Sequence, residues 1–337
     1  MMTLKKNISI LPYNTFAVDV QADYLVEYDS ADELIAFLNS DIAKNNRLLP
    51  IGSGSNLLFL SDFKGVILHS AINVLDIVNE NDEYIYLKVG SGVIWDDFAA
   101  YCVSKNWSGA ENLSHIPGTV GASAVQNIGA YGVEAKDIIH EVETVEIATL
   151  EQRTFSTDEC HYAYRDSIFK KEYSGKYIVT AVVFRLSKKP VFQLNYQHLE
   201  AEVTKRGEIN LQDIRQTIID IRSEKLPDPA ITGNAGSFFM NPVVSTEHFL
   251  SIQKDYPQMP YYTISETETK IPAAWLIDQC GWKGKQIENV GVHQHQALVL
   301  INLGSASGKE VADVAKNIQT SVKNKFDIDL QPEVNFI

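Results

Sequence analysis

The chain has 337 residues, a formal net charge of −14, 45% hydrophobic residues and 21% charged residues. This composition allows a buried core, and the length is typical of one large domain or two smaller ones. A strongly acidic chain repels nucleic acid and anionic membranes, so both classes of partner are disfavoured. No apolar run reaches the roughly 18 residues that a membrane-spanning helix needs.

The cellular compartment is indicated by the N-terminus and the cysteines. Residues 1–16 lack the continuous apolar stretch of a secretory signal. Cys102, Cys160 and Cys280 lie far apart and form no CxxC pair, which fits a reducing compartment better than a disulfide scaffold. We therefore expect a cytoplasmic protein.

Helical and strand patterns alternate along the chain, which is typical of a mixed α/β or α+β fold. The first helix is predicted over residues 30–46, with Ser30 and Glu33 in a capping-box pattern. The pattern then predicts a strand, a Gly-rich turn and a strand over 47–60, a strand at 84–89, a helix at 94–105, a loop at 110–132, and strands at 140–147 and 177–186.

A helix is predicted over residues 211–225, and the following Lys-Leu-Pro-Asp-Pro-Ala sequence ends it, so a domain boundary is expected nearby. The remaining predictions are a helix at 272–280, a strand at 297–301, and a helix from 307 to about 326 with Ser307 and Glu310 as its caps. In the tail, Ile328, Leu330, Val334 and Phe336 alternate with polar residues, which predicts one buried face.

A first Gly-rich loop follows the strand near residue 50. It contains Gly52, Ser53, Gly54, Ser55 and Asn56. Glycine allows close backbone approach, so successive N–H groups can converge on an anion. The loop lacks the Gly-Lys-Ser/Thr end of a P-loop and the third glycine of a Rossmann fingerprint. An ordinary tight turn between strands remains an equal alternative.

A second loop between Ile116 and Gly132 is less ordinary, because four glycines fall within fifteen positions and no charged residue is present. Such a segment offers many neutral donors to a phosphorylated ligand, and long loops of this kind are often functional. The alternative is a long surface loop. The candidate binding residues are Pro117, Gly118, Thr119, Gly121, Ala122, Ser123, Gln126, Asn127, Gly129, Tyr131 and Gly132.

Together the two loops resemble the FAD-binding module of the UDP-N-acetylenolpyruvoylglucosamine reductase family, within the vanillyl-alcohol-oxidase-like (PCMH) flavoproteins. The resemblance continues to the C-terminus. It implies an α+β fold: a two-lobed FAD-binding domain at 15–220 (lobes of about 15–70 and 71–220), a smaller α+β substrate-binding domain at 221–326, and a C-terminal strand at 327–337 that returns to the active site. It also implies FAD, with the loops holding its pyrophosphate and ribityl chain. Because no specific attachment signal is present in the sequence, we expect the FAD to be non-covalent.

Three residues are candidates for the chemistry. From sequence alone, Arg165 is more simply a surface ion-pair partner, Ser237 a turn serine bonded to its own backbone, and Glu333 a solvated residue of an edge strand. The GxSxG elbow of hydrolases is absent around Ser237. By resemblance, Arg165 is the catalytic arginine, Ser237 the general acid and Glu333 the catalytic glutamate. Met240 departs from the family pattern, in which a lysine is common.

The resemblance also implies substrate-binding roles for Tyr196, Lys225, Asn241 and Gln296, with Lys283 a weaker candidate. Tyr196 would lie on a lid over the site, as in the longer type of the family. Lys225 is also well placed as a cation at a helix C-terminus. His293 and His295 share a face of a strand, but no third ligand lies at useful spacing, so no metal is expected.

The implied reaction is the NADPH-dependent reduction of UDP-N-acetylglucosamine enolpyruvate to UDP-N-acetylmuramate through FAD, by a protein that is expected to be monomeric. Arg165 and Glu333 would stabilise the enolate-like intermediate, and Ser237 would protonate the α-carbon. The main alternative is an FAD-dependent oxidase of the same fold group acting on an alcohol or sugar. A non-enzymatic flavin-storage protein is a further alternative, and the missing lysine argues against a P-loop transferase.

Overall fold

The computed structural model describes residues 1–196 and 198–337. Over these residues the chain divides into two compact units. The first unit comprises Met1–Ile8, Ala22–Ser53 and Lys64–Arg222, and the second comprises Ser9–Gln21, Gly54–Phe63 and Ser223–Ile337. Two short N-terminal segments therefore belong to the same unit as the C-terminal third of the chain.

A four-stranded sheet forms one part of the first unit, in the order β1 (Thr3–Ser9), β2 (Gln21–Tyr28), β5 (Phe63–Ser70) and β3 (Leu48–Ile51). Two short helices follow β2, namely α1 (Ala31–Leu38) and α2 (Asp41–Lys44). The single helix predicted over 30–46 is thus wrong. Ser40 accepts a hydrogen bond from the N–H of Ala43 and caps a new helix, because its short hydroxyl competes with the helical ladder.

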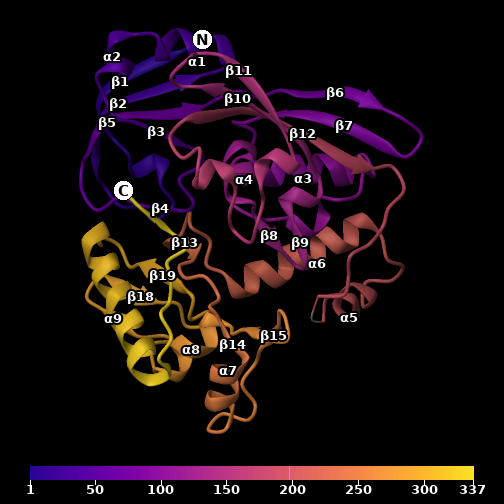
Figure 1. Cartoon of the computed structure of the whole chain (residues 1–337), viewed down its shortest axis with the longest axis vertical. Helices are drawn as coiled ribbons and strands as arrows, with labels where there is room; N and C mark the ends of the chain where they lie inside the picture. Colours follow the sequence, from indigo (N-terminus) through magenta and orange to yellow (C-terminus); the bar gives the residue numbers. More distant parts are fainter. Residues whose placement is uncertain (197) are drawn as a thin grey trace. The chain divides into compact units, whose positions relative to one another are not determined.

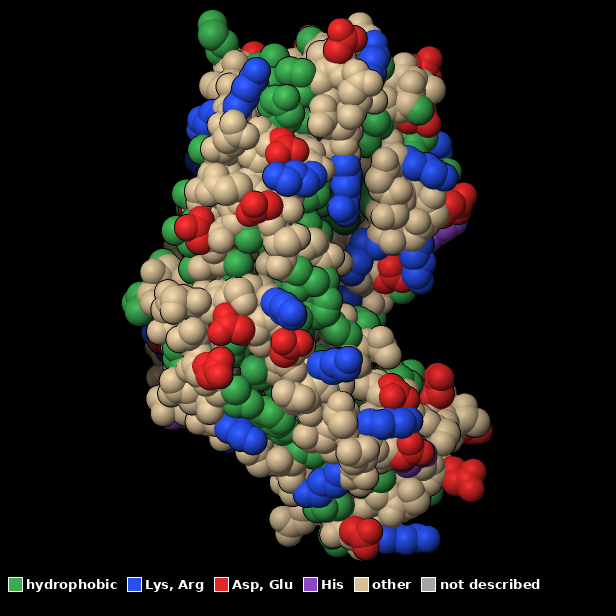
Figure 2. All heavy atoms as spheres, turned by 90° about the vertical axis from the view of Figure 1, so that its left-hand side faces the viewer, with side chains coloured by type: hydrophobic (Ala, Val, Ile, Leu, Met, Phe, Trp, Pro, Cys, Tyr) green, Lys and Arg blue, Asp and Glu red, His purple; other side chains and the backbone are tan. Residues whose placement is uncertain are grey.

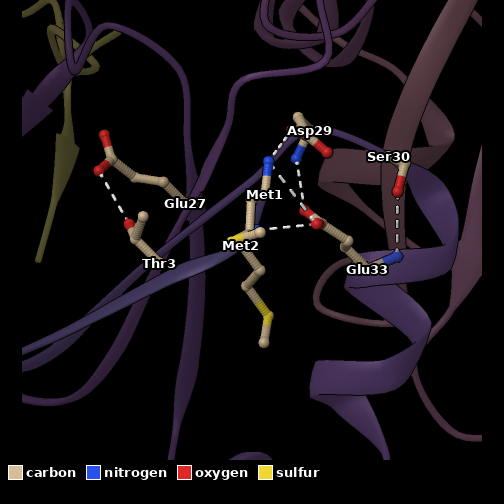
Figure 3. Close-up of polar contacts among 7 residues, drawn as sticks. All are labelled: Met1, Met2, Thr3, Glu27, Asp29, Ser30 and Glu33. Atoms are coloured by element: carbon tan, nitrogen blue, oxygen red, sulfur yellow. Dashed lines mark hydrogen bonds and ion pairs between the residues drawn. The ribbon is translucent and has the colours of Figure 1, made fainter.

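The start of α1 is tied to the chain terminus, as Figure 3 shows. The Ser30 hydroxyl accepts from the N–H of Glu33 at 3.2 Å, as predicted for an N-cap. The Glu33 carboxylate, however, accepts from the N–H groups of Met2 (2.8 Å) and Asp29 (3.1 Å). Glu33 therefore joins the chain terminus to the helix start and does not return to Ser30 as a full capping box would.

The larger sheet of the first unit has five antiparallel strands in the order β11 (Gln152–Ser156), β10 (Ile139–Glu146), β12 (Tyr177–Ser187), β7 (Tyr84–Gly90) and β6 (Leu75–Glu80). The apolar β12 is central and almost wholly buried, as predicted. The helices α3 (Trp95–Ser104) and α4 (Val120–Gln126) lie against one face of this sheet (Figure 1). Trp95, Phe98 and Phe184 pack there as an aromatic cluster.

The segment predicted as a loop over 110–132 contains regular structure, and that prediction is wrong in part. It holds a 3₁₀ turn at Glu111–Leu113, helix α4, and strand β8 (Gly129–Ala130), which pairs with β9 (Val133–Glu134). A Cβ on Gly121 would lie 2.7 Å from Cβ of Ser91. The glycine that lowers helix propensity is therefore the residue that lets α4 pack closely, and tertiary contact overrides propensity.

Short elements complete the first unit. Two of its helices are α5 (Leu199–Thr204) and α6 (Leu211–Lys225), the second of which was predicted and runs into the second unit at its last residues. The 3₁₀ turns there are Ala135–Asp137, Asp158–Cys160 and Ile168–Lys170.

The second unit has an antiparallel sheet in the order β13 (Gly233–Ser237), β19 (Val299–Asn302), β18 (Val290–Val292) and β17 (Gln286–Ile287). A smaller sheet has the order β14 (Val243–Ser245), β16 (Glu268–Lys270) and β15 (Tyr262–Thr263). The helices are α7 (Thr246–Gln253), α8 (Ala273–Gln279) and α9 (Gly308–Phe326), with a 3₁₀ turn at Leu11–Tyr13. The predicted strand near 297–301 and the two helices at 272–280 and 307–326 are confirmed, including the Ser307–Glu310 capping box.

The C-terminal tail is buried on one face for most of its length. Ile328, Leu330 and Val334 are buried as predicted, whereas Phe336 is 44% exposed. Only β20 (Asn335–Phe336) is a strand, and it pairs in parallel with β4 (Leu57–Leu58).

The face in Figure 2 carries acidic and basic side chains in alternation, not one continuous acidic field. Among the described residues, no helix is long and apolar enough to cross a membrane.

Candidate active site

The two Gly-rich loops meet inside the first unit. A Cβ on Gly52 would lie 2.5 Å from Oγ1 of Thr119 and 2.9 Å from Cβ of Ala122. Real Cβ atoms do not approach this closely, so only glycine allows the first loop to pack on the second. Residues far apart in sequence thus form one cradle of small side chains and backbone groups, which fits the phosphate-bearing cofactor implied by the sequence.

The second loop has a fixed backbone. Gly118 has a φ of +131°, and its carbonyl accepts from the N–H of Trp95 at 3.0 Å. The N–H groups of Val120 and Gly121 donate to the carbonyls of Val93 (2.9 Å) and Ser91 (3.0 Å). The protein's own hydrogen bonds therefore hold the loop to the start of α3, and such preorganisation lowers the entropic cost of binding.

Two predicted cofactor residues, Ser123 and Asn127, use their side chains within the protein. The Ser123 hydroxyl donates to the Val120 carbonyl at 2.7 Å. Asn127, 1% exposed and with a φ of +49°, donates to Glu134 and to the Ala163 carbonyl and accepts from the N–H of Lys136. These two side chains therefore stabilise the conformation of the loop. We expect the loop backbone and other residues to contact the cofactor.

Gly54, Ser55 and Asn56 of the first loop belong to the second unit. Gly54 has a φ of +63°, and a Cβ there would lie 2.1 Å from the carbonyl oxygen of Tyr13. The Asn56 side chain donates to the carbonyl of Glu333 at 3.1 Å. Asn56 thus positions the backbone of a candidate catalytic residue, a role that its place in a Gly-rich loop does not suggest.

Arg165 lies at the tip of a tight turn in the first unit. Ala163 and Asp166 exchange two backbone hydrogen bonds of 3.1 and 3.0 Å around Tyr164 and Arg165. Arg165 has a φ of +55°, a left-handed conformation that is disfavoured for a residue with a Cβ. Its Nη2 donates to the carbonyl of Gly129 at 2.9 Å, so the guanidinium lies beside the second Gly-rich loop.

Tyr196 also lies beside that loop. Its ring packs edge-on against Tyr131 with centroids 5.8 Å apart. The buried side chain of Asn112 donates to the carbonyls of Tyr131 (3.1 Å) and Gln193 (2.7 Å). Asn112 therefore ties the Tyr196 segment to the loop. Sequence reasoning missed this residue, because one asparagine before a Gly-rich stretch carries no distinctive pattern.

An ion-pair network at the entry to the second loop was also missed. Arg215 of α6 forms a bidentate pair with Asp96 (2.6 and 2.8 Å), and Asp96 also accepts from the N–H of His115. Burial raises the pKa of Asp96, but the hydrogen bonds from Arg215 and His115 and the charge of Arg215 outweigh it, so the net pKa is lowered.

The neighbouring Arg222 donates from Nε to the carbonyl of His115 at 3.0 Å. Burial lowers the pKa of its guanidinium, with the phenol of Tyr131 acting against this and the charge of Arg165 adding to it. Arg215 and Arg222 thus fix α6 to the residue that precedes the second Gly-rich loop. Their seven-residue spacing on a predicted helix was the available sequence signal.

Ser237 ends β13 in the second unit, directly after a bulge. The pairing of β13 with β19 shifts register between Asn234 and Ser237, and Gly236 has a φ of +66°. The Asn234 side chain accepts from the N–H of Gly236 at 2.9 Å and fixes this geometry. A bulge re-aims the next side chain. Among the described residues, no hydrogen bond holds the Ser237 hydroxyl, in contrast to the turn serine considered from the sequence.

Glu333 is anchored next to Ser237 by its backbone. Its N–H donates to the carbonyl of Phe238 at 2.8 Å, and the neighbouring residues Phe239 and Pro332 form an isolated antiparallel bridge. The N–H of Met240 donates to the carbonyl of Gln331 at 2.9 Å. The second unit thus brings two of the three predicted catalytic residues together, whereas Arg165 belongs to the first unit.

The predicted substrate residues differ in their surroundings. Asn241 accepts at Oδ1 from the N–H of Ala273 and caps α8, which leaves its amide nitrogen as a donor. Gln296 accepts a long hydrogen bond of 3.4 Å from the N–H of Leu298. Lys225 is exposed at the end of α6, and Lys283 lies 3.6 Å from Asp278. An ion-pair partner for Lys283 makes it the weaker anion-binding candidate of the two.

Two other side-chain classes are less suited to chemistry. Burial raises the pKa of the Cys160 thiol to about 11, and all three cysteines are free. A thiol with a raised pKa is a poor nucleophile at neutral pH. The His293 and His295 rings lie 5.6 Å apart, and the described residues contain no group of three or more His, Cys, Asp or Glu side chains that could hold a metal.

Comparison with protein families gives two matches. Residues 22–153 match an FAD binding domain, and residues 228–337 match the C-terminal domain of UDP-N-acetylenolpyruvoylglucosamine reductase. The first match contains both Gly-rich loops, and the second contains Ser237 and Glu333. The predicted FAD-binding fold is confirmed.

Full-length relatives carry the same description. The chain is 51% identical to UDP-N-acetylenolpyruvoylglucosamine reductase of Bacteroides fragilis over 334 residues, covering 99% of this chain and all of that one. It is 46% identical to the Porphyromonas gingivalis protein of the same name over 338 residues, covering all of both chains. The crystal structure of the Thermus caldophilus enzyme shares the fold, with a TM-score of 0.71, 20% identity and coverage of 100% and 99%.

Proposed function

The chain belongs to the UDP-N-acetylenolpyruvoylglucosamine reductase family, and we propose that it reduces UDP-N-acetylglucosamine enolpyruvate to UDP-N-acetylmuramate with FAD as cofactor and NADPH as reductant. The observation that carries this function is the 51% identity to a relative of that name along essentially the whole of both chains. The product is a precursor of peptidoglycan. No observation favours the alternative of an FAD-dependent oxidase acting on an alcohol or sugar.

The residues suit the cofactor and its chemistry. The cradle formed by Gly52, Thr119 and Ala122 would hold FAD, together with the fixed backbone of residues 118–121. Bound there, FAD would supply the hydride chemistry that links NADPH to the β-carbon of the enolpyruvyl group. Every other step is assigned to the protein.

Arg165 and Glu333 act on the charge of the substrate. Hydride addition to the β-carbon places negative charge on the α-carbon and the carboxylate, and a guanidinium stabilises that charge electrostatically. Glu333 polarises the enolpyruvyl group from a backbone that Phe238 and Asn56 hold in place. The left-handed turn fixes the position of Arg165 before the substrate binds.

Ser237 is the general acid. Its ordinary pKa is too high for a free acid, but an enolate-like carbon is basic enough to take the proton. The bulge before Ser237 supports this role, because it re-aims the side chain, and no hydrogen bond from the described part of the chain engages the hydroxyl. Tyr196, Lys225, Asn241 and Gln296 bind the nucleotide sugar, with Lys283 as a weaker contributor.

The cellular setting follows from the reaction and the composition. We propose that the protein is cytoplasmic, because its three thiols are free, and that it has no nucleic-acid or membrane partner, because the chain is acidic. We further propose that it is a monomer.

Product analysis tests the function. The FAD-loaded protein is incubated with NADPH and UDP-N-acetylglucosamine enolpyruvate, and the product is identified by mass spectrometry. We expect a gain of two hydrogens per molecule of NADPH consumed. Peroxide formation with unchanged enolpyruvyl substrate would contradict the proposal and favour an oxidase.

A further inference from the structure

We propose that Lys170 is a positioning residue that holds Arg165 and couples it to the cofactor loop. This inference rests on the proposed function, since it concerns the residue assigned to charge stabilisation. The structure suggests it directly, because the Lys170 ammonium contacts both the backbone of Arg165 and the side chain of Gln126.

The Arg165 turn lies outside the helices and strands of the described residues. Ala163 and Asp166 are joined by backbone hydrogen bonds, and Tyr164 and Arg165 are the two residues between them. The left-handed φ of Arg165 is disfavoured for a residue with a Cβ, and such conformations persist where the surroundings determine them. The contacts that hold the turn therefore decide where the guanidinium lies.

The neighbouring segment at the end of α4 supplies three of these contacts. The Asn127 side chain donates to the Ala163 carbonyl at 2.8 Å, and the Ser167 hydroxyl donates to the Val125 carbonyl at 2.6 Å. The Arg165 guanidinium donates to the Gly129 carbonyl at 2.9 Å. These hydrogen bonds join the turn to residues 125–129, a segment that contains predicted cofactor-binding residues.

Lys170 joins the two sides. It ends the 3₁₀ turn Ile168–Lys170, and its half-buried ammonium donates to the carbonyl of Arg165 at 2.8 Å and to Oε1 of Gln126 at 2.7 Å. A charged donor makes a stronger hydrogen bond than a neutral one, and the carbonyl it holds belongs to the residue in the disfavoured conformation. Movement of the cofactor loop at Gln126 is therefore transmitted to Arg165.

The chain offers a matched control in the next residue. Lys171 carries the same charge and pairs with Asp166 of the same turn, but its side chain is 72% exposed. Exposed ion pairs contribute little. Lys170→Met and Lys171→Met therefore remove one cation each, from adjacent positions, and only the first removes the contact with the Arg165 backbone.

The test measures the two half-reactions separately. In Lys170→Met, reduction of the flavin by NADPH should stay within about threefold of the unmodified protein. Reoxidation by UDP-N-acetylglucosamine enolpyruvate should slow by about 10- to 100-fold, as for a misplaced catalytic group. Lys171→Met should leave both rates within about twofold, and Lys170→Arg, which keeps the charge and donors, should recover most of the loss.

A double variant tests whether Lys170 acts through Arg165. In an Arg165→Ala background, adding Lys170→Met should change the reoxidation rate by less than about threefold, because the positioned group is already absent. Multiplicative losses would overturn the proposal. So would equal slowing of both half-reactions, loss of FAD, or identical behaviour of Lys170→Met and Lys171→Met.

Hydrogen exchange gives a readout that does not depend on turnover. The amides of Ala163 and Asp166 should exchange faster in Lys170→Met than in Lys171→Met. Equal exchange would overturn the positioning role. If the unmodified protein fails to reoxidise with the enolpyruvyl substrate, the proposed function fails, while the exchange contrast still decides whether Lys170 holds the turn.

Discussion

The backbone N–H of Glu333 donates a 2.8 Å hydrogen bond to the carbonyl oxygen of Phe238, the residue that follows Ser237. Two proposed catalytic residues, separated by almost a hundred positions in sequence, are therefore linked through one backbone contact. A second backbone hydrogen bond joins the same two segments, because the N–H of Met240 donates to the carbonyl of Gln331 at 2.9 Å. A change that shifts the C-terminal tail should consequently affect proton donation as well as substrate polarisation.

Replacement of Ser237 tests the proton donor. Ser237→Ala should leave flavin reduction by NADPH at its normal rate and slow reoxidation by the enolpyruvyl substrate by about 10²- to 10⁴-fold, the usual contribution of general acid catalysis. Rapid-mixing absorbance measurements separate the two steps. Thr232→Ala, a change of another half-buried hydroxyl on the same segment, is the control. The assignment of Ser237 is wrong if both half-reactions keep their full rates.

Replacement of Gly52 tests the cofactor cradle. Gly52→Ala places a Cβ 2.5 Å from Oγ1 of Thr119, so the loops must separate. Overpacking of this kind costs about 1–3 kcal/mol, which predicts about tenfold or greater weakening of FAD affinity if the loops bind the cofactor. Flavin fluorescence titration measures it.

Gly175→Ala is the control for Gly52. Gly175 has a φ of +70° and open space around its Cα, so the substitution introduces strain without a clash. It should lower the free energy of unfolding by about 1 kcal/mol and leave FAD affinity unchanged. Equal FAD affinity for the two variants would show that the loop contact does not matter for binding.

The Asp96–Arg215 pair should stabilise the first unit in a pH-dependent way. Asp96→Asn leaves the mostly buried Arg215 without a counter-charge and should cost about 2 kcal/mol at neutral pH, less than a fully buried pair would. The pKa of Asp96 is lowered by folding, so this stabilisation is present above the unfolded pKa and is lost as the pH falls through the folded value. Denaturant unfolding below about pH 4 should therefore show a shrinking difference between the two proteins.

Asp97→Asn is the matched control for Asp96. Both aspartates lie in the first turn of α3, so both interact with the helix dipole, but Asp97 is exposed. Asp97→Asn should change stability by less than about 0.5 kcal/mol. A pH-independent cost of Asp96→Asn would contradict the ion-pair interpretation.

The sequence predicts the elements that depend on local signals. The Ser307–Glu310 capping box, the apolar β12 and the helix at 211–225 have strong periodicity or caps, and all three are confirmed. Helix α4 was missed because its stability comes from close packing of Gly121 on Ser91, which no local pattern reveals. The division of residues 30–46 at Ser40 was missed because a cap inside a periodic stretch resembles a surface serine.

In the candidate site, too, some features can be predicted from local sequence and others depend on contacts between distant residues. The Gly-rich loops are visible in sequence because glycine content marks close backbone approach. The roles of Asn56, Asn112 and Lys170 depend on contacts with residues 277, 81 and 44 positions away, so sequence alone cannot give them. The catalytic roles proposed for Arg165, Ser237 and Glu333 came from family resemblance, since each residue alone had a simpler structural explanation.

An anaerobic titration tests whether the protein passes reducing equivalents from NADPH through FAD to the enolpyruvyl substrate. The FAD-loaded protein is reduced with NADPH while the flavin absorbance is recorded, and UDP-N-acetylglucosamine enolpyruvate is then added. We expect the flavin bands to bleach with NADPH and to return in proportion to the enolpyruvyl substrate added. Bands that do not bleach with NADPH, or that return only with oxygen, would contradict this expectation.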